Sequence, residues 1–431
     1  MPSIAYHTLG CKVNQYDTQA MEELLEDAGY QSVPFTENAD VYLVNTCTVT
    51  GTGDKKSLQI IRKIKREHPS SKLIVCGCMA QFQGEALLQT GADLVLGTQR
   101  RGEIVSLLSK VISSGHPVCA VTPLHDQVPF ECLSISRHHE HTRATLKIQE
   151  GCENRCSYCI IPQVRGPIRS RPLPDILQEA SRLATAGFCE IVLTGIHLSS
   201  YGRDLNDGTT LSHVIHCLQQ TDGILRIRLG SLEPTIATPS FSASLRMDDK
   251  VCPQFHLALQ SGSNSVLARM RRRYNTDQYL AAIDNLRFQF PNAAFTTDIL
   301  TGFPGETEEE FEETAAMIRK VGFARIHVFP YSPRPNTPAA GMAGQLPDAV
   351  RQQRARYLIA VGEDTARHYR LSWQDKVSVL LPEEISNGCW EGYTPEYLRV
   401  RLPADAVCRS GCPVPIRIVS AASSVMTGQL L

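Results

Sequence analysis

The sequence predicts an α/β protein with three parts: an N-terminal doubly wound parallel sheet, a central partial βα barrel and a small C-terminal all-β domain. Short apolar runs alternate with amphipathic stretches through residues 1–113, a pattern typical of parallel strands covered by helices. A second alternation of this kind occupies residues 142–371. From 372 to 431 the apolar runs follow one another without an amphipathic helix between them, which indicates a β domain.

Length and composition are those of an ordinary globular protein. The chain of 431 residues suits two or three domains, and it is 42% hydrophobic and 20% charged. These values exclude a disordered chain and a disulfide-stapled mini-protein. No apolar run approaches the roughly 18 residues that span a bilayer, and the N-terminus lacks the features of a signal peptide. We therefore expect a cytoplasmic protein without membrane association.

Net charge gives no support for nucleic-acid binding. The 43 basic residues nearly balance the 44 acidic ones, which leaves a formal net charge of −1. Any nucleic-acid surface must therefore be a local patch.

Four strands and two helices are expected in the N-terminal part. The helix over 16–29 has Asp17 as its cap and Gly29 as its stop, and a second helix covers 57–68. The segment GTGDKKS (51–57) lacks the glycine that precedes the lysine of a phosphate-binding loop, so we reject that interpretation. The expected strands are SIAYHTLG (3–10), VYLVN (41–45), KLIVCG (72–77) and DLVLG (93–97).

Residues 114–141 are expected to form an irregular linker before the second βα series. Six strands then fit a barrel or partial barrel, with one connecting helix over 175–187. These strands are RATLKIQEGC (143–152), EIVLTG (190–195), RIRLGS (226–231), FHLALQ (255–260), AFTTDIL (294–300) and RIHVFPY (325–331). The tail from 372 onward has strands in KVSVLLP, EYLRVRLP and VPIRIVS.

Fifteen cysteines are the unusual feature of the composition. An odd count in a long chain without a signal peptide favours metal or redox chemistry over a disulfide framework. The sharpest motif is GCENRCSYCIIP, in which Cys152, Cys156 and Cys159 follow the first barrel strand. Three thiolates at this spacing hold three irons of a [4Fe–4S] cluster and leave the fourth open. The alternatives are coincidence or a zinc site, but zinc wants a fourth ligand that IIPQVRG does not supply.

This C-x3-C-x2-C motif at the head of a βα barrel resembles the radical S-adenosylmethionine (SAM) enzymes. The resemblance implies that the open iron is chelated by the amino and carboxylate groups of the cofactor. One-electron reduction then cleaves the sulfonium and produces a 5′-deoxyadenosyl radical, while the protein orients and shields it.

A second set of cysteines follows three strands of the N-terminal sheet. Cys11, Cys47 and Cys78 each lie where an expected strand ends, and parallel strands end at the same edge of a sheet. We therefore expect their thiols to converge on one cluster, the alternative being three unrelated buried thiols. Cys76 lies inside its strand and is expected to be packed. The remaining cysteines, including Cys408 and Cys412, are expected to be structural.

Motifs along the whole chain match the methylthiotransferase family. They are HTLGCKVNQYDT, NTCTVT, GCMAQ, LTGIH, GSLEP, LQSGSNSVLARMRRRY, TGFPGETEEEF and YSPRPNTPA, together with the radical SAM motif. The C-terminal β domain resembles the RNA-binding TRAM domain. HTLGCKVN, TGTGDKKS and LKIQEGC look most like the branch that acts on N6-threonylcarbamoyladenosine beside the tRNA anticodon. Asn336 stands where the family pattern has glycine, a change that a turn accommodates.

The resemblance implies a reaction and its participants. Cys11, Cys47 and Cys78 would hold an auxiliary [4Fe–4S] cluster that delivers sulfur. One SAM molecule methylates the sulfur, and another makes the radical that activates C2 of the adenine. The implied partners are the tRNA anticodon stem-loop and a reductant protein such as flavodoxin or ferredoxin. The alternatives are isopentenyladenosine or a ribosomal-protein aspartate as substrate and, from another class, an iron–sulfur electron carrier or RNA-binding module.

Each of the remaining candidate residues has either a functional or a purely structural explanation. Glu233, Gln260 and Asp298 lie near the C-terminal ends of barrel strands and are candidates for cofactor contact, or are polar residues satisfied within the fold. Two basic clusters are candidates for phosphate contact, with Tyr274 for base stacking, or they form solvated or ion-paired faces. These clusters comprise Arg165, Arg169 and Arg171, and Arg271, Arg272 and Arg273. Thr307 and Glu310 are expected to form a helix capping box.

Overall fold

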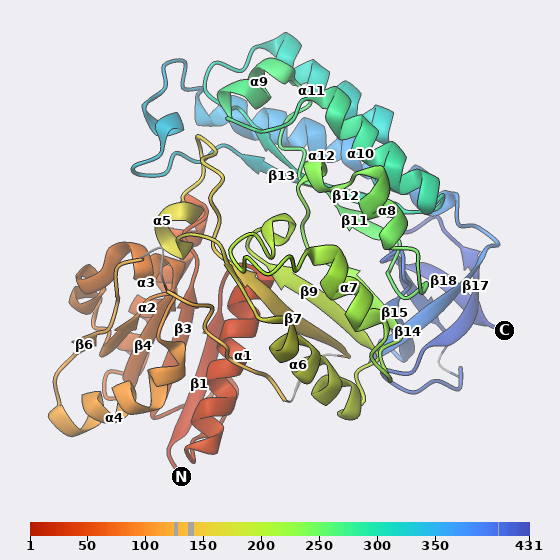
Figure 1. Cartoon of the computed structure of the whole chain (residues 1–431). Coiled ribbons are helices and arrows are strands. Elements are labelled where there is room, and N and C mark those ends of the chain that lie inside the picture. The colour runs from red at the N-terminus through yellow and green to blue at the C-terminus, as the bar shows by residue number, and fades with distance from the viewer. Residues whose placement is uncertain (125–127, 137–141, 404) are drawn as a thin grey trace.

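The N-terminal sheet has six parallel strands and confirms the doubly wound prediction (Figure 1). The strands are β1 (Ser3–Thr8), β2 (Gln31–Ser32), β3 (Val41–Thr46), β4 (Lys72–Gly77), β5 (Leu94–Leu96) and β6 (Val118–Cys119). Their order across the sheet is β2-β1-β3-β4-β5-β6. This computed structural model describes the whole chain except residues 125–127, 137–141 and 404. The linker predicted over 114–141 contains residues 125–127 and 137–141, so this part of the prediction lies outside the described residues. The two-residue strand β6 also falls within that segment and adds to the edge of the sheet.

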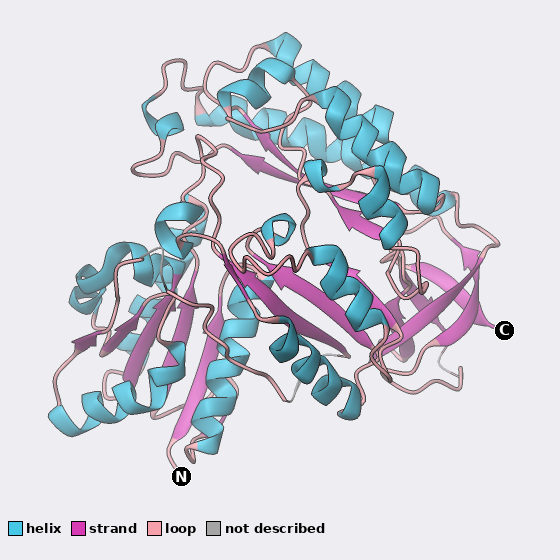
Figure 2. Ribbon diagram, in the orientation of Figure 1, coloured by secondary structure: helices cyan, strands magenta, loops and turns pink. Residues whose placement is uncertain are grey.

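Helices cover both faces of this sheet, because its central strands are apolar on both sides (Figure 2). Leu43 and Ile74 face one apolar cluster, whereas Val44 and Val75 face the other. The helices are α1 (Lys12–Asp27), α2 (Gly51–Glu67), α3 (Cys78–Gln83) and α4 (Ile104–Ser114).

The starts of two helices differ from the sequence expectation. Helix α1 begins at Lys12 with Cys11 as its N-cap, so the predicted capping role of Asp17 is wrong. Asp17 lies inside the helix, buried, where it pairs with cations described below. Helix α2 begins at Gly51, and the Thr50 hydroxyl accepts a hydrogen bond from the Gly53 amide at 3.1 Å. GTGDKKS therefore forms the first turns of a helix.

The central part is the predicted partial barrel. Strands β10-β9-β7-β8 form one sheet and β11-β12-β13 another, and bridges between Ile227 and Val251 and between Leu232 and Leu257 join the two. Apart from short antiparallel β8, the strands run parallel. Helix α1 packs along β7, at the side where the arc is open. The strands are β7 (Arg143–Glu150), β8 (Arg169–Ser170), β9 (Glu190–Gly195), β10 (Arg226–Leu229), β11 (Gln254–His256), β12 (Ala294–Thr301) and β13 (Arg325–Pro330).

The helices of this part lie on the outside of the arc, except α5, which packs against α3 of the N-terminal domain (Figure 2). They are α5 (Ile161–Arg165), α6 (Leu173–Thr185), α7 (Leu211–Gln219), α8 (Pro239–Ser244), α9 (Asn264–Arg269), α10 (Thr276–Gln289), α11 (Glu308–Val321) and α12 (Asp348–Leu371). The predicted capping box of Thr307 and Glu310 is confirmed at the start of α11. Asn336 has a φ of 61°, the left-handed conformation that asparagine tolerates in a turn.

The C-terminal domain is a closed five-stranded barrel, which confirms the predicted β domain. It contains β14 (Val377–Ser386), β15 (Cys389–Tyr393), β16 (Arg399–Leu402), β17 (Val414–Ser420) and β18 (Met426–Leu430). It packs against the N-terminal ends of the central strands, where Arg226 donates to the Val379 carbonyl at 2.6 Å and Arg143 pairs with Glu383 at 2.7 Å. In the described part of the chain, no helix is long and apolar enough to cross a bilayer.

Candidate functional site

The structure brings the N-terminal cysteines to one edge of the first sheet. Cys11 lies between β1 and α1, Cys47 follows β3, and Cys78 opens α3 directly after β4. Strands β1, β3 and β4 are neighbours and run parallel, so their C-terminal ends meet as the sequence predicts. Cys11 is exposed, Cys47 is partly buried and Cys78 is buried. We call these three residues the N-terminal triad.

Two glycines allow the loops of the N-terminal triad to approach one another. A Cβ atom on Gly10 would lie 3.0 Å from the Cys47 Cβ and 3.2 Å from its Sγ. Gly77 has a φ of 91°, and a Cβ there would lie 2.2 Å from the Asn45 Oδ1 and 2.6 Å from the Thr46 carbonyl oxygen. Only glycine fits such a position. The turn from β4 into α3 therefore depends on Gly77, and it places Cys78 beside the other two loops.

Cys152, Cys156 and Cys159 lie on the single loop that joins β7 to α5, and we call them the barrel triad. The Cys152 amide donates to the Gly166 carbonyl at 2.9 Å, and the Cys159 amide donates to the Cys156 carbonyl at 3.1 Å. Burial raises the pKa of the Cys152 thiol to about 11 and that of Cys159 to about 12. The loop is therefore folded so that thiolates there require a metal or a cation to be stable.

Each triad has an arginine that donates to one of its thiols. The Arg165 Nε lies 3.1 Å from the Cys78 Sγ, and the Arg272 Nη1 lies 3.1 Å from the Cys156 Sγ. Burial raises the pKa of Cys78 to about 12, while the charge of Arg165 acts in the opposite direction. A guanidinium at hydrogen-bond distance stabilises a thiolate over a thiol.

The thiol arrangement fits a cluster better than a single ion. No three His, Cys, Asp or Glu side chains among the described residues lie close enough to hold one metal ion. A [4Fe–4S] cluster binds each thiolate at a different iron, so its ligands stay apart. Three thiols with one cationic donor therefore fit this group at both triads, whereas a structural zinc ion would bring four ligands together.

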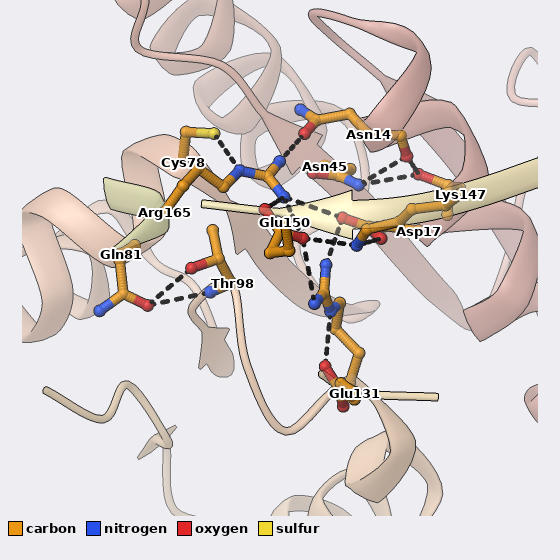
Figure 3. Close-up of polar contacts among 12 residues, drawn as sticks. Asn14, Asp17, Asn45, Cys78, Gln81, Thr98, Glu131, Lys147, Glu150 and Arg165 are labelled. Atoms are coloured by element: carbon orange, nitrogen blue, oxygen red, sulfur yellow. Dashed lines mark hydrogen bonds and ion pairs between the residues drawn. The ribbon is translucent and has the colours of Figure 1, made fainter. Parts of the chain in front are cut away.

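A buried network of charges surrounds Arg165 and connects the domains (Figure 3). The Arg165 Nη1 lies 3.0 Å from Glu150 and 3.1 Å from Asp17, and its Nη2 donates to Asn14. The Lys147 Nζ contacts the same two carboxylates at 2.5 and 2.6 Å. Asp17 belongs to the N-terminal domain, whereas Lys147, Glu150 and Arg165 belong to the barrel. The network therefore joins the two domains directly beside Cys78.

Arg101 extends the network to the segment between the domains. Its guanidinium pairs with Asp17, and its Nε lies 2.9 Å from Glu131. No motif in the sequence pointed to Arg101, Lys147 or Glu150. Charged residues in strands and loops give no sign in the sequence that they are buried in pairs.

The structure corrects the predicted phosphate contacts in the first basic cluster. Arg165, Arg169 and Arg171 are 0%, 4% and 2% exposed, so they do not form a surface for RNA. Arg169 donates to the Arg165 carbonyl at 2.9 Å, and Arg171 pairs with Glu179 at 2.7 Å. Their charges are used inside the protein, because a buried arginine requires acidic or carbonyl partners.

The second basic cluster is divided between surface and interior. Arg271 and Arg273 are exposed, whereas Arg272 faces the barrel triad and pairs with Glu233 at 3.3 Å. Tyr274 is buried, and its hydroxyl donates to the Leu259 carbonyl at 3.0 Å, so the predicted stacking role for its ring is wrong.

Among the predicted cofactor residues, Glu233 lies beside the barrel triad, where it shares Arg272 with Cys156. It follows β10, and its carboxylate accepts hydrogen bonds from Asn154 at 3.1 Å and from Arg272. His197 contacts it at 3.2 Å. Burial acts to raise the pKa of Glu233, but the His197 hydrogen bond and the charge of Arg272 lower it to about 2. No sequence pattern pointed to Asn154 or His197 as neighbours of Glu233.

Gln260 and Asp298 lie farther along the arc of strands. Gln260 adopts a φ of 65°, and its backbone amide donates to the Asp298 backbone carbonyl at 2.9 Å. The Asp298 carboxylate lies on β12, 3.4 Å from the His256 Nε2. Asp298 lines a cavity together with Cys11, whereas neither Gln260 nor Glu233 lines it. The three predicted cofactor residues therefore belong to at least two different surroundings.

Comparison with known proteins identifies two family regions. Residues 3–97 match the family described as Uncharacterized protein family UPF0004, and residues 146–318 match the Radical SAM superfamily. The two matches contain the N-terminal triad and the barrel triad, respectively.

Curated relatives cover nearly the whole chain. The threonylcarbamoyladenosine tRNA methylthiotransferase MtaB of Bacillus subtilis is 40% identical over 406 residues, which is 93% of this chain and 90% of the relative. The protein of the same name from Thermotoga maritima is 34% identical, over 93% and 91% of the two chains. A tRNA-2-methylthio-N(6)-dimethylallyladenosine synthase from Pelotomaculum thermopropionicum is 36% identical, over 81% and 80%.

A solved structure supports the fold assignment. The radical SAM methyltransferase TsrM from Kitasatospora setae, with cobalamin and a [4Fe–4S] cluster bound, has a TM-score of 0.58 over 79% of this chain and 77% of its own. At 15% identity this likeness concerns the fold alone. From the two family regions and the length of the matches to curated relatives, the chain belongs to the radical SAM methylthiotransferase family, in the threonylcarbamoyladenosine branch.

Proposed function

We propose that this enzyme attaches a methylthio group to C2 of N6-threonylcarbamoyladenosine at position 37 of tRNA. The observation that carries the proposal is the pair of separate cysteine triads, each with its own arginine donor. A methylthio transfer needs a radical source and a sulfur source, and two triads supply two sites. The first relatives described above bear the name of this activity.

The chain's residues divide into two groups by role. The barrel triad holds a [4Fe–4S] cluster, and the N-terminal triad holds an auxiliary one. Bound SAM supplies the deoxyadenosyl radical and the methyl group. Glu233 stays ionised beside the barrel triad, so it is available to accept hydrogen bonds from a cationic cofactor. Arg272 holds Glu233 and Cys156 in position relative to each other.

The finer assignments belong to the same proposal. The RNA partner is the anticodon stem-loop, with exposed Arg271 and Arg273 available for its phosphates. The reductant is a protein such as flavodoxin or ferredoxin, and the enzyme works in the cytoplasm. The functional units are residues 1–113 and 142–371, followed by the TRAM-like domain over 372–431.

The test is mass spectrometry of tRNA nucleosides from cells with and without the gene. Loss of 2-methylthio-N6-threonylcarbamoyladenosine, with accumulation of its unmethylthiolated precursor, is the expected result. Loss of the methylthiolated isopentenyladenosine instead would show that isopentenyladenosine is the substrate. A change confined to a ribosomal protein would show that the protein is the substrate. Anaerobic cleavage of SAM by the reconstituted protein separates an enzyme from an electron carrier or RNA-binding module.

A further inference from the structure

A cavity of about 530 Å³ lies where all three domains meet. The N-terminal domain contributes Cys11 and Lys12, and the C-terminal domain contributes Tyr397. The rest of the wall comes from Val13 on α1, from the strands of the barrel and from the residues that follow β10. Cys152, Cys156 and Cys159 are not among its lining residues. The cavity therefore adjoins the N-terminal triad, whose sulfur-delivering role is proposed above, through Cys11.

The wall of this cavity carries an excess of positive charge. Its lining includes Lys12, Arg228 and Arg325 but only one carboxylate, that of Asp298. Asp298 already has His256 beside it at 3.4 Å. A concave surface with this imbalance attracts an anionic ligand.

Two of the three cations form no hydrogen bond or ion pair with another described residue. Arg228 is 1% exposed and pairs with Glu190 at 2.8 Å, so its charge is compensated. Lys12 and Arg325 are exposed, and neither has a hydrogen bond or ion pair with a described residue. An ammonium and a guanidinium that the protein leaves unpaired in a cavity are available to bind a carboxylate.

The cavity also suits a nucleobase. Its volume is within the range of about 300–1,000 Å³ that is usual for small-molecule sites. Phe329 on β13 lines the cavity and is 43% exposed. Its ring is therefore available to stack on a base that is flipped out of the RNA. Cys11 on the wall places this position beside the N-terminal triad.

We infer that this cavity receives the modified adenine, and that Lys12 and Arg325 select the carboxylate of its threonylcarbamoyl group. This inference rests on the proposed function, because it concerns the same substrate. A neutral N6 substituent such as isopentenyl would leave both cations without a partner. The cavity thereby distinguishes the two classes of modified adenosine by charge, a discrimination that an apolar pocket does not provide.

The test compares two anticodon stem-loops that differ only in this carboxylate. One carries threonylcarbamoyladenosine, and the other carries the corresponding threonine amide, which has nearly the same shape without the charge. Binding to the reconstituted enzyme is measured without turnover. The wild type is expected to prefer the carboxylate by about ten- to hundredfold, the range for a hydrogen bond between charged groups. The double variant Lys12→Gln with Arg325→Gln is expected to bind both stem-loops equally, and the single variants assign the effect.

Lys110→Gln is the matched control, because Lys110 is exposed on α4 and does not line the cavity. This variant should retain the wild-type preference. The inference is overturned if the double variant keeps the preference or if the wild type has none. It is also overturned if the variants weaken the binding of both stem-loops by the same factor, because that result indicates contacts with phosphates. Iron content and the visible spectrum check that the clusters are retained.

Methylthiolation of the stem-loops is scored separately from binding. If the wild type binds the carboxylate form preferentially but does not methylthiolate it, the proposed function fails and the anion-selective cavity stands. If the wild type methylthiolates threonylcarbamoyladenosine and the double variant retains full discrimination, the proposed function stands and the inference fails.

Discussion

The two cysteine triads are built in opposite ways. The barrel triad lies on one loop, between β7 and α5, so its thiols are close because they are close in sequence. The N-terminal triad comes from three loops, and its members meet because β1, β3 and β4 are parallel neighbours. A local motif therefore specifies the first site, whereas the topology of a sheet specifies the second.

The triads also differ in the origin of their arginine donors. Arg272, which contacts Cys156, belongs to the same domain as the barrel triad. Arg165, which contacts Cys78, comes from the barrel and reaches into the N-terminal domain. The barrel site is thus complete within its own domain, but the N-terminal site is complete only when the domains are packed together. Four predictions test this difference.

The largest effect is expected from removal of the barrel triad. Replacing Cys152, Cys156 and Cys159 by Ala should abolish SAM cleavage, because these three thiols hold the cluster to which SAM binds. The iron content should fall from about eight to about four per chain, since two [4Fe–4S] clusters hold four irons each. Anaerobic iron and sulfide analysis measures this. A best-reconstituted wild type with only about four irons would exclude a cluster at the N-terminal triad.

Removal of the N-terminal triad should separate the two halves of the reaction. The protein with Cys11, Cys47 and Cys78 replaced by Ala is expected to form 5′-deoxyadenosine but to attach no methylthio group to tRNA. The reason is that the barrel triad keeps its own ligands and its own arginine. Both products are measured in one anaerobic assay. Normal methylthiolation by this variant would reject the sulfur-delivery role.

Substitution of Arg165 should affect one cluster more than the other. Arg165→Met removes a buried cation from Asp17 and Glu150, which should lower the free energy of unfolding by about 3–5 kcal/mol. It also removes the donor to Cys78, so the reduction potential of the N-terminal cluster should fall. Redox titration followed by electron paramagnetic resonance measures both clusters.

Arg272→Met is the matched variant for the barrel triad, because it removes the donor to Cys156. We expect it to shift the potential of the barrel cluster and to leave the N-terminal one unchanged. Equal shifts of both clusters in either variant would show that the arginines act through overall stability and not through their own thiols.

The smallest effect is expected at Cys76, which is 1% exposed inside β4. Cys76→Ala should lower the free energy of unfolding by about 1–2 kcal/mol, because it removes one packed sulfur atom. Methylthiolation and iron content should remain normal. Chemical denaturation and iron analysis test this, and loss of half the iron would assign Cys76 to the cluster in place of Cys78.

Much of the fold and both triads were predictable from local patterns. The apolar runs that form β3 and β4 are buried on both faces, as continuous hydrophobic strands are in parallel sheets. Once these strands were identified, their shared direction placed Cys47 and Cys78 at one edge. The capping box of Thr307 and Glu310 was also predictable, because its partners are three residues apart.

The partners of the charged residues are evident in the folded protein and not in the sequence. Arg165 and Asp17 are 148 positions apart in sequence, yet they form a buried pair, and Arg169 and Arg171 are enclosed in the same way. Lys12 and Arg325 come from different domains and line the same cavity, and neither is ion-paired with another described residue. The sequence does not distinguish a charged residue in an ion pair from one on the surface or in a cavity. Local patterning therefore predicted which cysteines lie at one sheet edge, because it predicts parallel strands, whereas the environment of each charge depended on contacts between distant segments.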